Sequence, residues 1–292
     1  MSATRPLCWI GLPFVLACAA PRASPRPALH YDGPVIDIHT HLLLDDTTET
    51  PTQSDIPGAL MHRRLSHIGL IVVVPRPDIE RTRQLNDQLA RVVRQHPGRF
   101  FAIGTVHPGD GEQAIRELER IKAMGFLMLK LHPIMQRLDV ASDEVVVVVR
   151  KASELGLPVL FDFSGIANAA DLGAFVMLAA RVPEARIVLA HMGGTRFHEL
   201  LVLSMLQRYP WYHNNLWVDL SAVAAMYADS PYRDELVYVI RKIGVDRVLF
   251  GSDMPFARTP VEAIADVERL GLRPAEERLI FHDNAASLLG LL

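Results

Sequence analysis

The sequence predicts an α/β protein, specifically a (β/α)₈ TIM barrel, and three observations support this fold class. From Gly33 onward, apolar strand-like segments alternate with amphipathic segments, eight such strands fit in the chain, and their starts lie 27 to 35 residues apart. Each interval has the size of one βα unit, and eight of them in succession are typical of a closed parallel barrel. A doubly wound open sheet is the structural alternative, but no glycine-rich phosphate turn follows any of the predicted strands.

The predicted strands are runs of β-branched and other apolar residues that lack the alternation of a half-exposed strand. This composition is expected where both faces of a sheet are buried. In chain order the predicted strands are Val35–Ile38, Leu70–Val74, Phe100–Val106, Leu127–Leu131, Pro158–Phe163, Arg186–Ala190, Leu216–Leu220 and Arg247–Gly251.

The segments between the strands predict helices. Arg81–Gln95 and Glu112–Lys122 carry charged residues on one face and Leu, Ile or Val on the other. Val145–Val149 is a run of five valines that alone would favour a strand. The preceding Ser142-Asp143-Glu144 is typical of a helix start, so we interpret this run as a buried helix. The glycines expected to end helices are Gly125, Gly156, Gly244 and Gly271.

The composition is that of an ordinary globular protein. The chain is 50% hydrophobic and 22% charged, with a formal net charge of −3, which disfavours disorder and a membrane-spanning bundle. This near-neutral balance gives no electrostatic footprint for nucleic acid. Aromatic residues make up 7% of the chain, too few for base-stacking platforms. The expected partner is therefore a small-molecule substrate.

The first thirty residues differ from the rest, so we divide the chain into an export segment with a tether (1–30) and the barrel (31–292). The apolar stretch 7–20 is too short to span a bilayer and suits a signal-peptide core. Val15-Leu16-Ala17-Cys18 resembles a bacterial lipobox, in which Cys18 would carry the lipid anchor and provide the only contact with a membrane. Ala19–Leu29 would then be a flexible tether.

Two other interpretations of this segment stay open. It could be a plain secretory signal, or an extension that carries no address, which Pro6 and Pro13 within the apolar stretch would suit. The first two interpretations predict an exported protein, in the bacterial periplasm or anchored to a membrane. The only cysteines, Cys8 and Cys18, lie in this segment, so a barrel without cysteine has neither a thiolate nucleophile nor a cysteine zinc site.

Polar residues fall at the carboxyl ends of the predicted strands, where barrel enzymes place their reactive groups. The first strand ends in Asp37-Ile38-His39-Thr40-His41, and side chains two apart on a strand point the same way. The fourth, sixth and eighth strands end near Lys130-Leu131-His132, His191 and Asp253. Imidazole and carboxylate ligands suit zinc, iron or manganese. The sequence therefore predicts one divalent metal ion at the mouth of the barrel.

Other features have simpler interpretations. Lys130 fits either an ion pair with a nearby carboxylate or a role toward substrate or metal. We expect His107 and His198 to be peripheral and His282 to be structural, in a C-terminal helix. Asp45–His67 is the longest predicted connection and could cover the barrel mouth.

These residues resemble the amidohydrolase superfamily, specifically its amidohydrolase-related branch, which includes aminocarboxymuconate-semialdehyde decarboxylase, resorcylate decarboxylases and dicarboxylate lactonases. The resemblance runs from Val35 to Leu292. It is carried by Asp37-Ile38-His39-Thr40-His41, His96-Pro97-Gly98-Arg99-Phe100, Lys130-Leu131-His132-Pro133, Leu189-Ala190-His191-Met192-Gly193-Gly194, Phe250-Gly251-Ser252-Asp253-Met254-Pro255 and Asn284-Ala285-Ala286.

One position departs from the family pattern. Most members of the family carry a metal-binding histidine at the end of the fifth strand, where this chain has Asp162, in Leu160-Phe161-Asp162-Phe163. A carboxylate can bind the same metals, and its charge would strengthen binding while making the metal a weaker Lewis acid. The alternatives are that metal affinity is degraded, or that Asp162 points into the barrel wall.

The resemblance implies a metal-dependent hydrolase that acts on an amide, lactone or similar C–N or C–O bond of a small, carboxylated molecule. His39, His41 and Asp253, with Asp162 or His191, would hold one ion, zinc first and manganese or iron as alternatives. Asp253 and His191 would be the catalytic residues, Asp253 as the proton acceptor and His191 polarising or protonating the substrate. The substrate carboxylate would bind to Lys130 and His132.

Three alternatives to a hydrolase with one metal ion remain. A carboxylated Lys130 that bridges two metals, as in binuclear members, is less favoured. The same centre could instead catalyse non-oxidative decarboxylation, which the motifs do not separate from hydrolysis. The third is a non-catalytic, degenerate barrel that lost its activity with the fifth-strand histidine.

Overall fold

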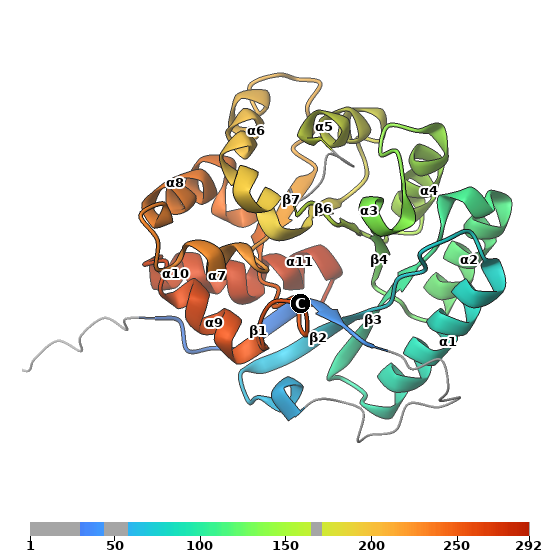
Figure 1. Ribbon diagram of the computed structural model, residues 1–292, viewed down its shortest axis with the longest axis horizontal. Coiled ribbons are helices and arrows are strands. Elements are labelled where there is room, and N and C mark those ends of the chain that lie inside the picture. Colours follow the sequence, from blue (N-terminus) through green and yellow to red (C-terminus); the bar gives the residue numbers. More distant parts are fainter. Residues whose placement is uncertain (1–29, 44–57, 165–170, 292) are drawn as a thin grey trace, which may run out of the picture.

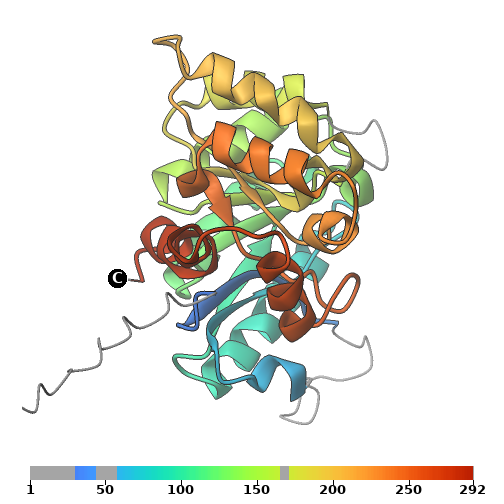
Figure 2. The same ribbon diagram turned by 90° about the vertical axis from the view of Figure 1, so that its left-hand side faces the viewer.

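Eight parallel strands form one sheet in chain order (Figure 1). The computed structural model describes residues 30–43, 58–164 and 171–291. Helices surround the strands, so the predicted (β/α)₈ barrel is confirmed (Figures 1 and 2). The strands are β1 (Val35–His41), β2 (Leu65–Ile71), β3 (Phe100–Thr105), β4 (Met128–Leu131), β5 (Val159–Phe161), β6 (Ile187–Leu189), β7 (Leu216–Asp219) and β8 (Val248–Leu249).

The barrel closes between β1 and the segment that follows β8. The backbone N–H of Ile38 donates to the carbonyl of Phe250 at 3.1 Å, and that of Asp253 donates to the carbonyl of His39 at 2.7 Å. These bonds bring the end of the eighth strand against the first, although the two lie at opposite ends of the chain.

The helices follow the strands along the chain and lie outside the barrel (Figures 1 and 2). No helix in the described parts of the chain is both long enough and apolar enough to cross a membrane. The helices are α1 (Ile79–Gln95), α2 (Glu112–Ala123), α3 (Pro133–Gln136), α4 (Asp143–Glu154), α5 (Leu172–Arg181), α6 (Leu201–Leu206), α7 (Val223–Tyr227), α8 (Arg233–Ile243), α9 (Pro260–Glu268), α10 (Pro274–Arg278) and α11 (Asn284–Leu289).

The valine run lies in α4, as predicted. Ser142 caps this helix, because its hydroxyl accepts a hydrogen bond from the N–H of Val145 at 3.4 Å. Val147 is 52% exposed, while the other four valines of the run are buried. The helical period therefore buries four of the five valines against the barrel, and this burial outweighs their local preference for strands.

The predicted helix-ending glycines all follow or cap a helix. Gly125, Gly156, Gly244 and Gly271 have φ of 89°, 68°, 105° and 73°. These left-handed conformations favour glycine because it has no Cβ.

The prediction for the second strand was wrong by several residues. The predicted Leu70–Val74 is replaced by β2, which begins at Leu65, and His67 pairs with Ile36 of β1. Ser66 and His67 are half-buried and hide the start of the strand, whereas Val72–Val74 continue the apolar run beyond its end. The predicted connection Asp45–His67 therefore ends at Arg64.

Some predictions lie outside the described residues. These are the export segment with Cys18, except for His30, and the connecting residues 45–57.

Apolar side chains fill the barrel interior toward the amino ends of the strands, and α11 closes that end of the barrel. Arg186, next to the amino end of β6, donates to the carbonyl of Leu288 in α11 at 2.6 Å. Side chains two apart on a strand share a face. Lys130 and Asp162 therefore lie on the same interior face as Met128 and Leu160, one step nearer the carboxyl ends of the strands. The interior cluster comprises Ile36, Ile38, Ile71, Phe101, Ile103, Met128, Leu160, Val188, Ala190 and Leu249, with Ala285, Ala286 and Leu288 of α11.

Candidate metal centre

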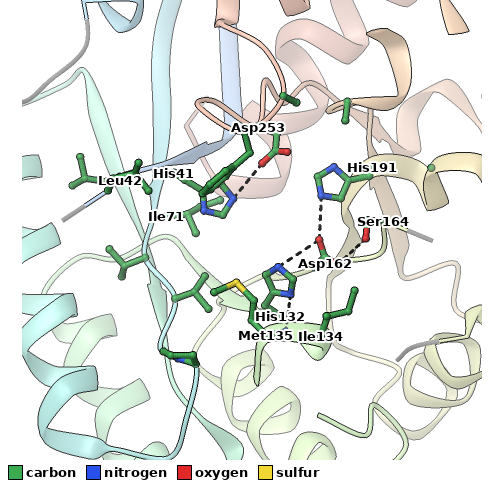
Figure 3. A pocket seen from close by; sticks show the side chains of 18 of the residues that line it. His41, Leu42, Ile71, His132, Ile134, Met135, Asp162, Ser164, His191 and Asp253 are labelled. Carbon is green, nitrogen blue, oxygen red and sulfur yellow. Dashed lines mark hydrogen bonds and ion pairs between the residues drawn. The ribbon is translucent and has the colours of Figure 1, made fainter. Parts of the chain in front are cut away.

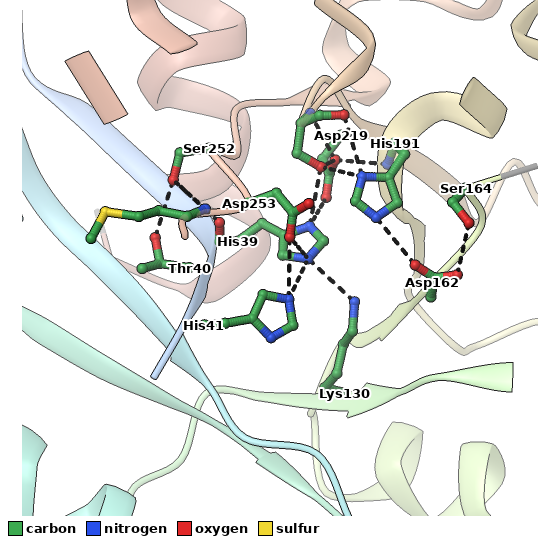
Figure 4. Close-up of polar contacts among 12 residues, drawn as sticks. His39, Thr40, His41, Lys130, Asp162, Ser164, His191, Asp219, Ser252 and Asp253 are labelled. Atoms are coloured by element: carbon green, nitrogen blue, oxygen red, sulfur yellow. Dashed lines mark hydrogen bonds and ion pairs between the residues drawn. The ribbon is translucent and has the colours of Figure 1, made fainter. Parts of the chain in front are cut away.

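Three side chains of the ligand type meet where β1 ends and the chain leaves β8 (Figure 4). His41 Nε2 lies 3.3 Å from both His39 Nε2 and Asp253 Oδ1, and His39 Nε2 lies 3.5 Å from the same carboxylate oxygen. Ligand atoms about 2.1 Å from one ion in tetrahedral geometry lie about 3.4 Å from each other. The three atoms therefore have the spacing of ligands that share one ion.

Backbone geometry fixes this arrangement. The β1–β2 register is irregular between Asp37 and Thr40, the stretch that carries His39. Asp37 ties the first strand to the segment after β8, because its Oδ1 accepts hydrogen bonds from the N–H groups of His39 (3.0 Å) and Ser252 (3.1 Å). Burial raises the pKa of Asp37 to about 6. Asp253 has φ 57°, a conformation that non-glycine residues adopt mainly where the surrounding structure imposes it.

The charge states suit a divalent cation. Burial and the charge of Lys130 lower the pKa of His39 to about 4, and burial likewise lowers the pKa of His41. Burial raises the pKa of Asp253, but the hydrogen bond with His41 and the positive charge of His191 contribute in the opposite direction, and the pKa lies below its ordinary value. Two neutral imidazoles and one carboxylate are the ligand set that zinc, iron and manganese accept.

Asp219 orients the buried member of this group. His39 Nδ1 donates to Asp219 Oδ2 at 2.8 Å, so the lone pair of His39 Nε2 points toward the other two ligand atoms. Asp219 Oδ1 also accepts hydrogen bonds from the N–H groups of His191 (2.9 Å) and Ser221 (3.0 Å). Burial raises the pKa of Asp219, but His39 holds it well below its usual range. A carboxylate on the second nitrogen of a histidine is a common support of metal ligands.

Sequence reasoning did not single out Asp219. It lay inside the predicted strand Leu216–Leu220 as a lone carboxylate. The signal that could have identified it is an acidic residue at a strand end, followed two positions later by Ser221.

Lys130 lies beside the triad in the barrel interior. It is 1% exposed, its Nζ lies 3.4 Å from His39 Nε2, and it does not line the cavity above the site. Burial lowers the pKa of Lys130, although Asp162, Asp219 and Asp253 oppose this shift. Because a divalent ion repels an ammonium group, an ion at the triad would favour the neutral form of Lys130 further.

Asp162 is paired with histidines rather than with the triad (Figure 3). Its Oδ2 lies 3.2 Å from His191 Nε2 and 3.8 Å from His132 Nε2, and its Oδ1 accepts a hydrogen bond from Ser164 at 3.3 Å. Burial raises the pKa of Asp162, but the hydrogen bond with His191 and the charge of Lys130 hold it well below its usual range. Among the described residues, Asp162 belongs to no group of converging ligand atoms.

His191 has partners on both ring nitrogens. Nε2 lies against Asp162, and Nδ1 lies 2.9 Å from Ser221 Oγ. Burial lowers the pKa of His191, but the hydrogen bond with Asp162 outweighs burial and raises it overall. His191 also groups with His39 and Asp219, whose ligand-type atoms all lie within 4.8 Å of one another. The bond between His39 and Asp219 already accounts for two members of that group.

A cavity of about 1220 Å³ opens above the triad (Figure 3). Five of the predicted site residues line it: His41, His132, Asp162, His191 and Asp253. Burial lowers the pKa of His132 to about 4. The cavity therefore gives access both to the triad, through His41 and Asp253, and to Asp162 with the histidines beside it, His132 and His191.

The three other histidines considered in the sequence, His107, His198 and His282, lie elsewhere. His107 is buried with Nε2 3.0 Å from the carbonyl of Gln136, and His198 is exposed; neither lines this cavity. His282 lies in the helical segment between α10 and α11, with Nδ1 2.8 Å from Asp283 Oδ1.

Three solved structures resemble the chain at 19–20% sequence identity. The 2,6-dihydroxybenzoate decarboxylase from Rhizobium is 19% identical with a TM-score of 0.67, over 89% of this chain and 99% of that one. The dihydroxybenzoic acid decarboxylase from Polaromonas, with bound manganese and the inhibitor 2-nitroresorcinol, is 20% identical with a TM-score of 0.63, over 89% and 97%. A probable 2-pyrone-4,6-dicarboxylic acid hydrolase from Acinetobacter baumannii with citric acid bound is 19% identical with a TM-score of 0.60, over 88% and 99%.

At these identities the three structures show a shared fold and no more. The family is shown by a separate comparison, in which the family model described as Amidohydrolase matches residues 36–291. That match spans the barrel from β1 to α11 and includes every residue of the triad. The resemblance seen in the sequence is confirmed, and the chain belongs to the amidohydrolase family.

Proposed function

We propose that the protein is a metal-dependent hydrolase that cleaves an amide, lactone or similar C–N or C–O bond of a small molecule. The observation that carries this proposal is the spacing of 3.3–3.5 Å among the ligand atoms of His39, His41 and Asp253. His41 and Asp253 also line the large cavity, so a substrate can reach an ion held there. A divalent ion at this point would polarise a carbonyl group and lower the pKa of water.

The side chains would divide the remaining work. Asp253 can accept the proton of the attacking water and return it to the leaving group. His191 carries a raised pKa and faces the cavity, so its positive charge would stabilise negative charge that develops on the substrate oxygen. Asp162 and Ser221 hold the ring of His191 in place. His132 lines the same cavity and would contact a polar group of the substrate.

The identity of the ion is also a proposal. Two imidazoles and a carboxylate suit zinc, which we place first. Manganese is the alternative, and the manganese bound in the Polaromonas decarboxylase favours it.

Non-oxidative decarboxylation is the second candidate function. The Rhizobium and Polaromonas structures, which share this fold over 89% of the chain, favour it. The same centre would then orient a carboxylated aromatic substrate instead of activating water. A non-catalytic barrel is disfavoured, because the ligand atoms of the triad lie close enough together to share one ion and Asp219 supports His39.

A substrate panel tests these functions. The protein is treated with chelator, reloaded with zinc or with manganese, and incubated with lactones, amides and carboxylated phenols, with detection of ring opening, amine release and CO₂. Metal-dependent cleavage of a lactone or amide supports the hydrolase. Release of CO₂ alone selects decarboxylation, and no turnover by protein shown to contain metal contradicts both.

A further inference from the structure

We propose that the substrate carries its reacting group on a hydrophobic body, which lies against an apolar wall at the carboxyl ends of β1 and β2. This inference rests on the proposed function, because the ion would hold the reacting group. It adds the chemical class of the remainder of the substrate, which neither the triad nor the family defines.

The cavity has two unlike sides (Figure 3). Asp162 and His191 lie on one side, while Leu42 and Ile71 lie on the other, beyond His41. We define the apolar wall as the lining residues Leu42, Ile71, Val72, Val73 and Leu85.

The apolar wall is already formed without a substrate. Ile71 is 0%, Val72 4%, Leu85 8% and Leu42 9% exposed, because each packs into the protein behind the wall. A surface held in this way loses little side-chain entropy when a ligand binds, so contact with an apolar group is favourable.

The size of the cavity exceeds what a small ring requires. A cavity of about 150 Å³ is enough to hold benzene, whereas this one measures about 1220 Å³. A single carboxylated ring bound at the triad would therefore leave most of the cavity filled with water. A larger hydrophobic body would displace this water from the space beside the apolar wall.

The charges of the lining favour the same class of substrate. Among the described residues that line the cavity, Arg81 is the only lysine or arginine. The entrance also exposes large apolar side chains, with Leu43 67%, Phe256 66% and Met135 49% exposed, and all three line the cavity. Exposed apolar side chains gathered around one opening mark a binding region. A second anionic group on the substrate would find few partners here.

The test uses two hydroxamic acids, which offer the ion the same chelating group on tails of different length. Binding of acetohydroxamate and of octanohydroxamate to the manganese-loaded full-length protein is measured by calorimetry, with the metal content checked after each titration. Burial of four of the six extra methylenes, at about 0.8 kcal/mol each and 1.4 kcal/mol per tenfold, predicts that octanohydroxamate binds at least about 100-fold more tightly.

Matched variants locate the tail. Val73→Asp places a charge on the apolar wall and should remove most of the gain for octanohydroxamate, while acetohydroxamate binds as before. Val147→Asp makes the same change on the exposed face of α4, away from the cavity, and should alter neither affinity. Val73→Asn, with Val147→Asn on α4 as its control, repeats the comparison with an uncharged and milder change if Val73→Asp does not fold.

The outcomes separate the two proposals. Equal affinities for the two hydroxamates would overturn the hydrophobic substrate while leaving the metal centre intact. A gain for octanohydroxamate that survives Val73→Asp, or Val73→Asn where that variant is used, would also overturn the inference, because the tail would then lie elsewhere. Failure of the protein to hold manganese would overturn the proposed function first, and with it this inference.

Discussion

The two sides of the barrel mouth are built from the same residue types but arranged for different tasks. Where β1 meets the segment after β8, three ligand atoms face one another at 3.3–3.5 Å, and His39 uses its other nitrogen to bind Asp219. Next to β5 and β6, Asp162 lies 3.2 Å from His191, whose second nitrogen is held by Ser221. We call these the triad side and the paired side.

The difference shows that histidine and aspartate at strand ends do not by themselves define a metal centre. On the triad side the lowered pKa values favour neutral imidazoles, and the Nε2 atoms of His39 and His41 face a common point. On the paired side, the lowered pKa of Asp162 and the raised pKa of His191 describe an ion pair. The two sides therefore differ in what the Nε2 atoms face: other ligand atoms on the triad side, and the Asp162 carboxylate on the paired side.

The largest effect is expected from Asp253→Asn, which breaks the triad side. Loss of a supporting residue outside the ligands costs about 10–100-fold in metal affinity or activity, so loss of a ligand should exceed about 100-fold. Elemental analysis and turnover with zinc or manganese measure this loss, and unchanged far-UV circular dichroism shows that the barrel remains folded. A variant with full metal content and full activity would refute the triad.

Asp219→Asn should have the next largest effect, because it acts on the triad only through His39. We expect metal affinity to fall about 10–100-fold while the ion still binds at high concentration. Titration with zinc measures this loss, and Asp234→Asn on the exposed surface of α8 is the matched control. An unchanged affinity would mean that Asp219 only maintains the backbone around His191.

Much of the fold could be predicted because buried strands and helices have regular patterns of apolar residues in the sequence. Strands buried on both faces appear as short apolar runs, and their spacing of one βα unit predicts the barrel. The second strand was misplaced because two polar residues, Ser66 and His67, interrupt the apolar pattern at the start of β2. Val72 and Val73 extend the apolar pattern beyond the end of β2, and they form part of the apolar wall.

The site was predictable only in outline. The sequence places three site residues at the carboxyl ends of strands: His39, His41 and Asp253. Because these strand ends meet at the mouth of the barrel, the sequence predicts that the three side chains lie close together. The separation of Asp162 from the triad depends on where a carboxylate points, to within a few ångströms, and the sequence does not encode that geometry in a local pattern. Asp219 was missed for a related reason, since one acidic residue in a buried strand has no partner visible in the sequence.

Asp162→Asn tests the paired side and should leave the ion in place. We expect metal affinity to change by less than tenfold, below the range of about 10–100-fold for residues that support a ligand. The free energy of unfolding should fall by about 1–1.5 kcal/mol, because the charge-assisted hydrogen bond with His191 becomes a weaker neutral one. Zinc titration and chemical denaturation measure the two quantities.

Asp162→His gives the complementary measurement, since it restores the family residue. If the new imidazole tightened metal binding more than tenfold, this position would belong with the ligands and the division between the two sides would fail. Retained affinity with a folded protein would support it.

The smallest effect is expected from Glu276→Gln, a buried acid far from the mouth that serves as a reference for both sides. Arg241 donates to its two oxygens at 3.0 Å each, and these hydrogen bonds lower the pKa of Glu276 to about 2. A depressed pKa stabilises the fold above the unfolded value of about 4.3, and this contribution is lost as the pH falls through 4 toward 2. Because Arg241 is 45% exposed, the contribution should be about 1 kcal/mol or less. Chemical denaturation should therefore show a small, constant difference between wild type and variant above pH 5, which shrinks on acidification while zinc affinity stays unchanged. A difference that grew as the pH fell would contradict the assigned direction of the pKa shift.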